Sequence, residues 1–169
     1  TALPNGSLQY SIGNKVKLAD KKSLSYVFAY SYSNTNNFSL VTRREFEEQS
    51  LGVITKNELK DSAYTKSILN TGLFNMKLDL GKRTEIQLKT LYSVSSDDKV
   101  NVRQGKRDMD IESVYNERST NIWYTQNNLL TTQLLGKHNW KDDWKFNWTA
   151  GYSHVARDIP FLRRMVYQQ

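Results

Sequence analysis

The stretch Leu8-Gln-Tyr-Ser-Ile-Gly-Asn-Lys-Val-Lys-Leu18 alternates between apolar and polar residues. Its even-numbered positions are apolar except for Asn14, and its odd-numbered positions are glutamine, serine, glycine and lysine. Because successive side chains of a β-strand point to opposite faces, this period of two predicts a strand with one apolar and one polar face. Its length exceeds the five or six residues usual for soluble strands and suits a tilted membrane crossing.

The same alternation recurs along the chain. It is found in six segments: 8–18, 24–32, 72–80, 85–94, 130–140 and 144–152. Across these segments the even positions carry no Asp, Glu, Lys or Arg, whereas the odd positions carry Lys15, Lys17, Lys77, Asp79, Glu85, Lys89, Lys137 and Lys145. Antiparallel strands joined by turns with an odd number of residues keep all even positions on one face. The pattern therefore predicts consecutive hairpins that share an uncharged face.

The connections between these segments are expected to alternate between short and long. Tight turns centre on Lys21, Lys82 and Asp142, and two long polar connections span 34–70 and 95–121. Short turns at one end and long loops at the other are typical of outer-membrane barrels, with the short turns on the periplasmic side. We therefore predict an all-β fold: an antiparallel up-and-down transmembrane β-barrel segment of about six long strands, with short periplasmic turns and long extracellular loops.

Aromatic residues lie near both ends of the predicted apolar face, as in the two interfacial girdles of membrane barrels. The predicted interface residues are Tyr10, Tyr30, Tyr32, Tyr92, Trp140, Trp144, Trp148 and Tyr152. If each hairpin is symmetric about its turn, Gly72 faces Tyr92 and Gly136 faces Trp148. Both glycines would then be covered by an aromatic neighbour, which offsets the weakness of glycine in a strand.

Composition excludes several other classes of protein. The 169 residues contain no cysteine, so disulfides and cysteine metal sites are excluded, and no apolar run approaches the length of a transmembrane helix. The net charge of +7 is scattered along the chain, which argues against nucleic-acid binding. We find no motif of a catalytic site and expect no enzymatic activity, cofactor or metal.

The predicted strands are too few to close a single-chain barrel, which needs at least eight. The N-terminal residues also lack a basic and apolar export signal. In addition, residues 157–169 are expected to begin a further long loop. We therefore expect residues 1–169 to be an internal piece of a larger barrel domain.

Three stretches resemble a known family. Gly136-Lys-His-Asn-Trp140 with Asp142-Asp-Trp-Lys-Phe-Asn-Trp148, the run Gly151-Tyr-Ser-His-Val-Ala-Arg-Asp-Ile-Pro-Phe-Leu-Arg-Arg164, and Leu91-Tyr-Ser-Val-Ser-Ser-Asp-Asp-Lys-Val100 are similar to the mid-barrel region of TonB-dependent receptors. The resemblance implies binding of a scarce nutrient by external loops and a plug domain. It also implies energised uptake driven by the inner-membrane TonB complex, and contact with outer-membrane lipid and lipopolysaccharide. The plug would lie outside residues 1–169.

Candidate ligand-binding residues lie in the predicted loops: Arg43, Arg44, Trp123, Arg157, Arg163 and Arg164. Residues 41–52 form either a short helix with a capping box at Thr42 and Glu45, or an extension of the preceding strand. The last three arginines either hold an anion or pair with neighbours such as Asp158.

Two further groups of residues could hold a metal but are expected not to. The alternating acids Asp108, Asp110 and Glu112 lack the glycine and terminal ligand of an EF-hand loop. His138 and His154 lie at opposite ends of different strands, which favours a position at the membrane interface over metal binding.

Three functions remain open from the sequence alone. The first is ligand uptake by a TonB-dependent receptor, with a metal chelate, peptide or glycan as ligand. The second is a passive porin or an adhesive outer-membrane barrel. The third is a soluble β-rich module, which would have to pack its aromatic faces against each other.

Overall fold

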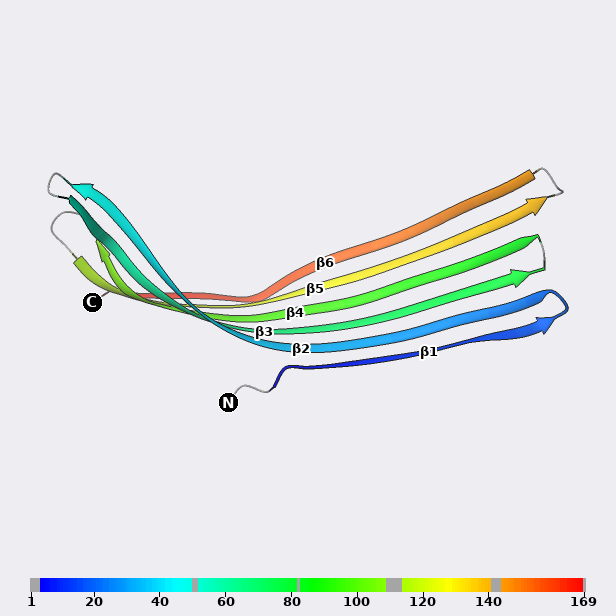
Figure 1. The fold of residues 1–169 in the computed structure, drawn as a ribbon, viewed down its shortest axis with the longest axis horizontal. Coiled ribbons are helices and arrows are strands. Elements are labelled where there is room, and N and C mark those ends of the chain that lie inside the picture. The colour runs from blue at the N-terminus through cyan, green and yellow to red at the C-terminus, as the bar shows by residue number, and fades with distance from the viewer. Residues whose placement is uncertain (1–3, 50–51, 82, 109–113, 141–143, 169) are drawn as a thin grey trace.

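The structure is a computed structural model that describes residues 4–49, 52–81, 83–108, 114–140 and 144–168. These residues form a single antiparallel sheet in which each strand pairs with the next along the chain. The strands are β1 (Gly6–Ala19), β2 (Lys22–Gln49), β3 (Gly52–Leu80), β4 (Thr84–Asp108), β5 (Val114–Trp140) and β6 (Trp144–Gln168). Figure 1 shows one curved layer, with β1 starting about half-way along the other strands.

The predicted all-β, up-and-down arrangement is confirmed, and all six predicted segments lie inside strands. The sheet is open, with β1 at one edge and β6 at the other. Lys21, at the centre of the first predicted turn, has a φ of 66° and lies in the tight connection between β1 and β2. Lys82 and Asp142, the other two predicted turn centres, lie outside the described residues.

The predicted long loops are wrong. Residues 34–49 continue β2 and pair with β3 as far as Gln49 opposite Gly52. Residues 95–108 continue β4 and pair with β5 as far as Asp108 opposite Val114, and the run from Arg157 to Gln168 continues β6. The polar composition of these stretches suggested loops, but a backbone ladder needs no apolar side chains and its cross-strand pairs can be polar.

The predicted helix over 41–52 is also wrong, and the alternative of a strand extension is confirmed for residues 41–49. Thr42 faces Lys60 and Glu45 faces Asn57 across the ladder, so the residues of the expected capping box form strand pairs instead. The part of the sheet beyond Asn34 of β2, which we call the outer half, is thus built entirely from extended hairpins in the described residues.

Register confirms that one parity occupies one face. Rows across the sheet join even numbers to even numbers, for example Leu24, Leu78, Ile86, Gly136 and Trp148. The even-numbered face is uncharged over positions 8–18, 24–34, 68–80, 84–96, 126–140 and 144–156. We call this region the apolar band. Because every pairing through the band preserves parity, the uncharged even positions of all six strands form one continuous surface of the sheet.

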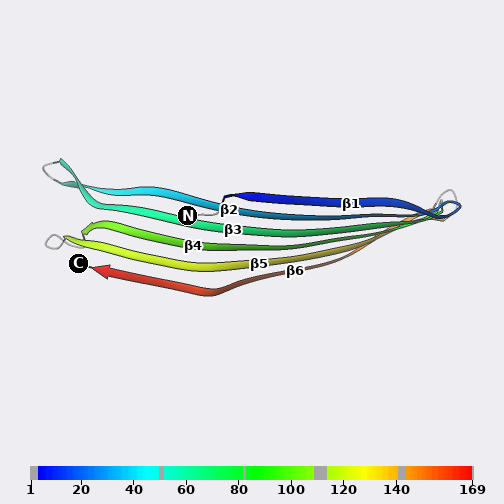
Figure 2. The ribbon, with the colours of Figure 1, turned by 90° about the horizontal axis from the view of Figure 1, so that it is seen from below.

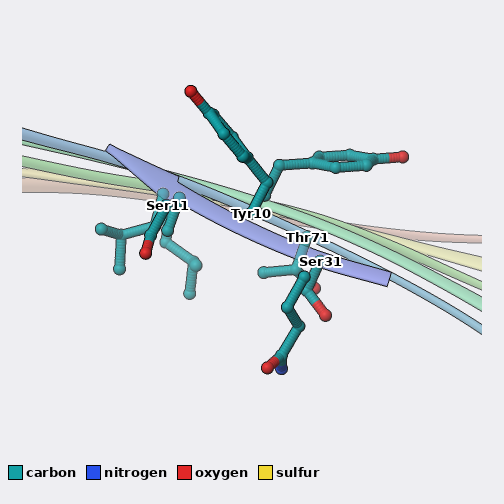
Figure 3. A pocket seen from close by; sticks show the side chains of 9 residues that line it. Tyr10, Ser11, Ser31 and Thr71 are labelled. Atoms are coloured by element: carbon teal, nitrogen blue, oxygen red, sulfur yellow. The ribbon is translucent and has the colours of Figure 1, made fainter. Parts of the chain in front are cut away.

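The odd-numbered face is polar, with charges concentrated near the short turns. Lys77 Nζ lies 2.8 Å from Glu85 Oε2 and 3.3 Å from Asp79 Oδ1, and Lys137 Nζ lies 3.6 Å from Glu85 Oε1. Further along the strands this face carries small residues together with Leu73 and Leu91. Figure 3 shows Ser11, Ser31 and Thr71 on the opposite side of the ribbon from Tyr10, around a hollow of about 330 Å³.

The apolar band is exposed because the described residues form only one layer. The single buried apolar residue among them is Leu59, whereas Leu8, Tyr10 and Phe146 are 61%, 54% and 60% exposed. The packing of aromatic faces against each other that a soluble module would need is therefore not formed within the described chain. Something other than these residues must cover the band if it is not to face water.

The two predicted aromatic–glycine pairs differ. Register places Gly72 opposite Tyr92 and Gly136 opposite Trp148, as predicted. At Gly136 a Cβ would overlap the indole ring of Trp148, whereas at Gly72 a Cβ would meet nothing within 4 Å. Trp148 thus covers its glycine and also donates a 3.0 Å hydrogen bond from Nε1 to His138 Nε2. The expected cover of Gly72 by Tyr92 is wrong.

This difference predicts opposite effects for two matched substitutions. Gly72→Ala should be neutral or stabilising by up to about 1 kcal/mol, because alanine restricts the unfolded chain without a clash. Gly136→Ala should destabilise the protein by about 1–2 kcal/mol, since Trp148 must leave its site and lose its bond to His138. Equilibrium unfolding in urea measures both variants, and equal effects would contradict the cover of Gly136.

Candidate functional site

A β-bulge in the outer half determines which side chains share a face. Tyr124 pairs with Phe161 and Gln126 with Asp158, so Thr125 of β5 stands opposite both Ile159 and Pro160 of β6. Proline has no N–H to give to a ladder, and a bulge is one of the few places in a sheet that tolerates it. Beyond the bulge the parity of β6 is inverted relative to β5. β6 bends in its outer part in Figure 2.

The bulge creates a depression on the odd-numbered face between β5 and β6. Its volume is about 470 Å³, and its lining residues are Asn121, Trp123, Thr125, Arg157, Ile159, Leu162 and Arg164. Trp123 pairs across the strands with Leu162, and Asn121 pairs with Arg164. Thr125, opposite the bulge, is 5% exposed, whereas Leu162 is 73% exposed. The depression is therefore a shallow site with a buried hydroxyl-bearing residue and an open, apolar rim.

The arginines of this depression have no acidic partner among the described residues. No ion pair joins Arg157, Arg163 or Arg164 to a carboxylate in that part of the chain. The alternative that they pair with neighbours such as Asp158 is therefore not supported. Asp158 pairs with Gln126 on the even-numbered face, whereas Arg157 pairs with Asn127 on the odd-numbered face.

The six predicted ligand-binding residues do not form one site. Trp123, Arg157 and Arg164 come together in the depression. Arg163 lies on the opposite face, where its guanidinium carbon is 5.5 Å from the centre of the Phe161 ring. Arg43 and Arg44 belong to β2, which is separated from β5 by two strands. Arg44 Nη2 is 3.1 Å from Glu58 Oε1, so that arginine is engaged in an exposed ion pair.

A buried ion-pair cluster lies next to the depression on the same face. Arg103 donates two hydrogen bonds to the Asp61 carboxylate, at 2.6 and 2.8 Å. Arg107 Nε lies 2.8 Å from Glu117 Oε2. Asp61 and Glu117 are 7% and 5% exposed. Two acids and two arginines thus neutralise each other here and join β3, β4 and β5 on this face.

Electrostatics in this cluster favour the charged forms. The hydrogen bonds from Arg103 lower the pKa of Asp61 below its ordinary value of 3.8, against the opposing effect of burial, and Arg43 adds a further favourable charge. The same hydrogen bonds raise the pKa of Arg103. Arg43 therefore has a structural neighbour in Asp61, rather than a place in the depression.

Sequence reasoning missed Asp61, Arg103, Arg107 and Glu117 because they fall in stretches that were assigned to loops. Alternation gave no signal for them, since charged residues occur at both odd and even positions of these stretches, but the register of the neighbouring strands did. Extending the register outward from the apolar band would have placed Asp61 opposite Arg103, as the structure does.

The predicted aromatic interface residues all lie on the even-numbered face. Tyr10 pairs with Tyr30, and the hydroxyl of Tyr30 donates a 2.9 Å hydrogen bond to Asn70 Oδ1. Trp140 and Trp144 face each other next to the third turn and are 77% and 78% exposed. The aromatic residues therefore occur at both ends of the apolar band, as predicted, while the membrane that they would contact remains a prediction.

The residues considered for metal binding do not assemble into a metal site in the described part of the chain. His138 contacts Trp148, and His154 pairs with Leu130 several rows away. Asp110 and Glu112 lie outside the described residues, as does the side chain of Asp108.

Comparison with known proteins gives no relative from which a function could be transferred: no family model and no curated protein matches this sequence. The described residues include no helix of the length and hydropathy required to span a membrane.

The Asp61–Arg103 pair predicts a specific pH dependence of stability. Because the pKa of Asp61 is lowered on folding, its contribution is present above pH 3.8 and is lost as the pH falls below that value. Asp61→Asn should lower the free energy of unfolding by about 1.5–3 kcal/mol at neutral pH and by much less near pH 2. Urea unfolding at several pH values measures this difference.

Glu58→Gln is the matched control, because it removes the acid of the exposed Arg44–Glu58 pair, whose side chains are 55% and 42% exposed. An exposed pair contributes little, so this variant should change stability by less than about 1 kcal/mol at any pH. A loss at Asp61→Asn that does not depend on pH would contradict the assigned role of the pair.

Proposed function

We propose that the sheet is part of the wall of an outer-membrane β-barrel that serves as a ligand-uptake receptor. The observation that carries the proposal is the apolar band: an exposed, uncharged face that continues across all six strands without a break. The odd-numbered face behind it carries Lys77, Glu85 and Lys137 at the same depth. Lipid on one side and water on the other would suit these two faces.

The depth of the band supports a membrane crossing. A tilted strand needs about 9–11 residues to span the hydrocarbon layer. On β3 the band extends from Leu80 at the short turn to Ile68, and the first charged even position after it is Lys66. β3 continues well beyond this point, to Gly52. The outer half would then project from the membrane on the extracellular side.

The open edges of the sheet support further strands. In lipid, each unpaired backbone group costs several kcal/mol, and only closed barrels avoid such edges. β1 and β6 each have one neighbour in the sheet. We propose that both pair with additional strands of one barrel, whose short turns face the periplasm and whose lumen is lined by the odd-numbered face.

The receptor role rests on the resemblance to TonB-dependent receptors and on the depression in the outer half. A projecting wall with a polar site on the lumen side suits capture of a ligand before it passes the membrane. The implied partners are lipopolysaccharide around the band, a plug inside the lumen, and the TonB complex that acts on the plug. A plug domain encoded before this segment supports energised uptake, whereas a barrel without one favours the passive porin.

The membrane position predicts different effects for two neighbouring substitutions. Phe74 lies on the even-numbered face in the middle of the band, and Asn75 lies beside it on the odd-numbered face. Phe74→Arg should destabilise the protein folded in lipid vesicles by about 2–4 kcal/mol, as arginine does at the lipid-facing midplane of a barrel. Asn75→Arg, which faces the polar side, should cost less than about 1 kcal/mol.

Unfolding of the intact protein in lipid vesicles measures both variants, and heat-dependent mobility in gels reports the folded fraction. Equal losses for Phe74→Arg and Asn75→Arg would contradict a lipid-facing band. A protein that folds fully in water without lipid or detergent would contradict the membrane location itself.

A further inference from the structure

The depression between β5 and β6 carries positive charge that its surroundings do not neutralise. Arg157 and Arg164 line it, and Lys99 lies beside Trp123 on the neighbouring strand. Lys99 forms an ion pair with Asp97, whose Oδ2 lies 3.9 Å from the ammonium group. Asp97 stands opposite Thr125 on the same face, so this acid offsets the charge of Lys99. The acids Asp61 and Glu117 are matched by arginines of their own. Arg157 and Arg164 have no carboxylate partner among the described residues, so an anion would meet two guanidinium groups that remain uncompensated.

The rest of the lining is apolar or aromatic. Trp123, Ile159 and Leu162 surround the arginines, and the indole offers a flat surface on which a ring can stack. Guanidinium groups bind carboxylate and phosphate through paired hydrogen bonds. We propose that the depression binds an organic anion in which a carboxylate or phosphate is attached to a ring or another apolar group.

The bulge selects the arginine that takes part. Arg163 and Arg164 are adjacent in sequence, and the extra residue opposite Thr125 places Arg164 on the face of Trp123 and Arg163 on the other. Without the bulge the two arginines would exchange faces. Bulges commonly redirect side chains in this way next to functional sites. Arg163 is therefore a matched control for Arg164, because it is the neighbouring arginine on the opposite face.

The face on which the depression opens distinguishes a lipopolysaccharide phosphate from an anion that enters the lumen. A phosphate of lipopolysaccharide would reach the sheet from the even-numbered, lipid-facing side, which is where Arg163 lies. The depression opens on the odd-numbered side. The proposed ligand class rests on the proposed uptake function, because it names what the receptor would take up. Binding to the depression can nevertheless be measured without measuring transport. A protein that binds no anion would not contradict the barrel assignment. A protein that is not a barrel could still bind an anion in the depression.

The test uses the intact protein in phosphatidylcholine nanodiscs, titrated calorimetrically with three probes. Phenyl phosphate has both an anionic group and an aromatic ring. Inorganic phosphate has the charge without the ring, and benzyl alcohol has the ring without the charge. We expect phenyl phosphate to bind most tightly, and its affinity to fall as salt is raised. Binding of benzyl alcohol as tight as that of phenyl phosphate would overturn the proposal.

The decisive comparison is between Arg164→Gln and Arg163→Gln, and Arg157→Gln is a third variant that supports it. Arg164→Gln should weaken phenyl phosphate binding by at least about tenfold, the usual effect of losing a hydrogen bond to a charged group, and Arg157→Gln should act in the same direction. Arg163→Gln should leave affinity within about twofold. Equal losses at Arg163 and Arg164 would show a general charge effect and overturn the site, as would retention of full affinity in both Arg157→Gln and Arg164→Gln.

Discussion

Parity in the backbone ladder determines which side chains of this sheet share a face. Throughout the apolar band, each strand pairs with the next so that even positions meet even positions. A shift of one residue in any pair would send a whole strand's apolar side chains to the charged face. The uncharged surface, its aromatic borders and the proposed contact with lipid all follow from this register.

In the outer half the same ladder continues without an apolar face, and polar pairs replace it. The buried pairs Asp61–Arg103 and Arg107–Glu117 hold β3, β4 and β5 together on one side. The inversion of parity at Pro160 then places Arg164, rather than Arg163, on the same face as Arg157. A local irregularity, rather than the regular alternation, thus decides which side chains meet in the depression.

The sequence was sufficient for the strands of the apolar band and for their register, because alternation there is nearly uninterrupted. It was insufficient for the outer half. Polar strands such as 52–69 have the composition of loops, and only their cross-strand partners make them strands. The candidate site could be predicted in part: Trp123, Arg157 and Arg164 were named, but the bulge that excludes Arg163 depends on pairing that periodicity alone does not reveal.

An accessibility scan along β4 tests directly whether the apolar band faces lipid. The native sequence has no cysteine, so single cysteines from Ile86 to Ser93 can each carry a spin label without a background signal. In lipid vesicles, positions 86, 88, 90 and 92 should collide readily with oxygen dissolved in the bilayer, and positions 87, 89, 91 and 93 should not. Equal access at both sets, or greater access of a water-soluble nickel chelate to the even set, would contradict a lipid-facing band.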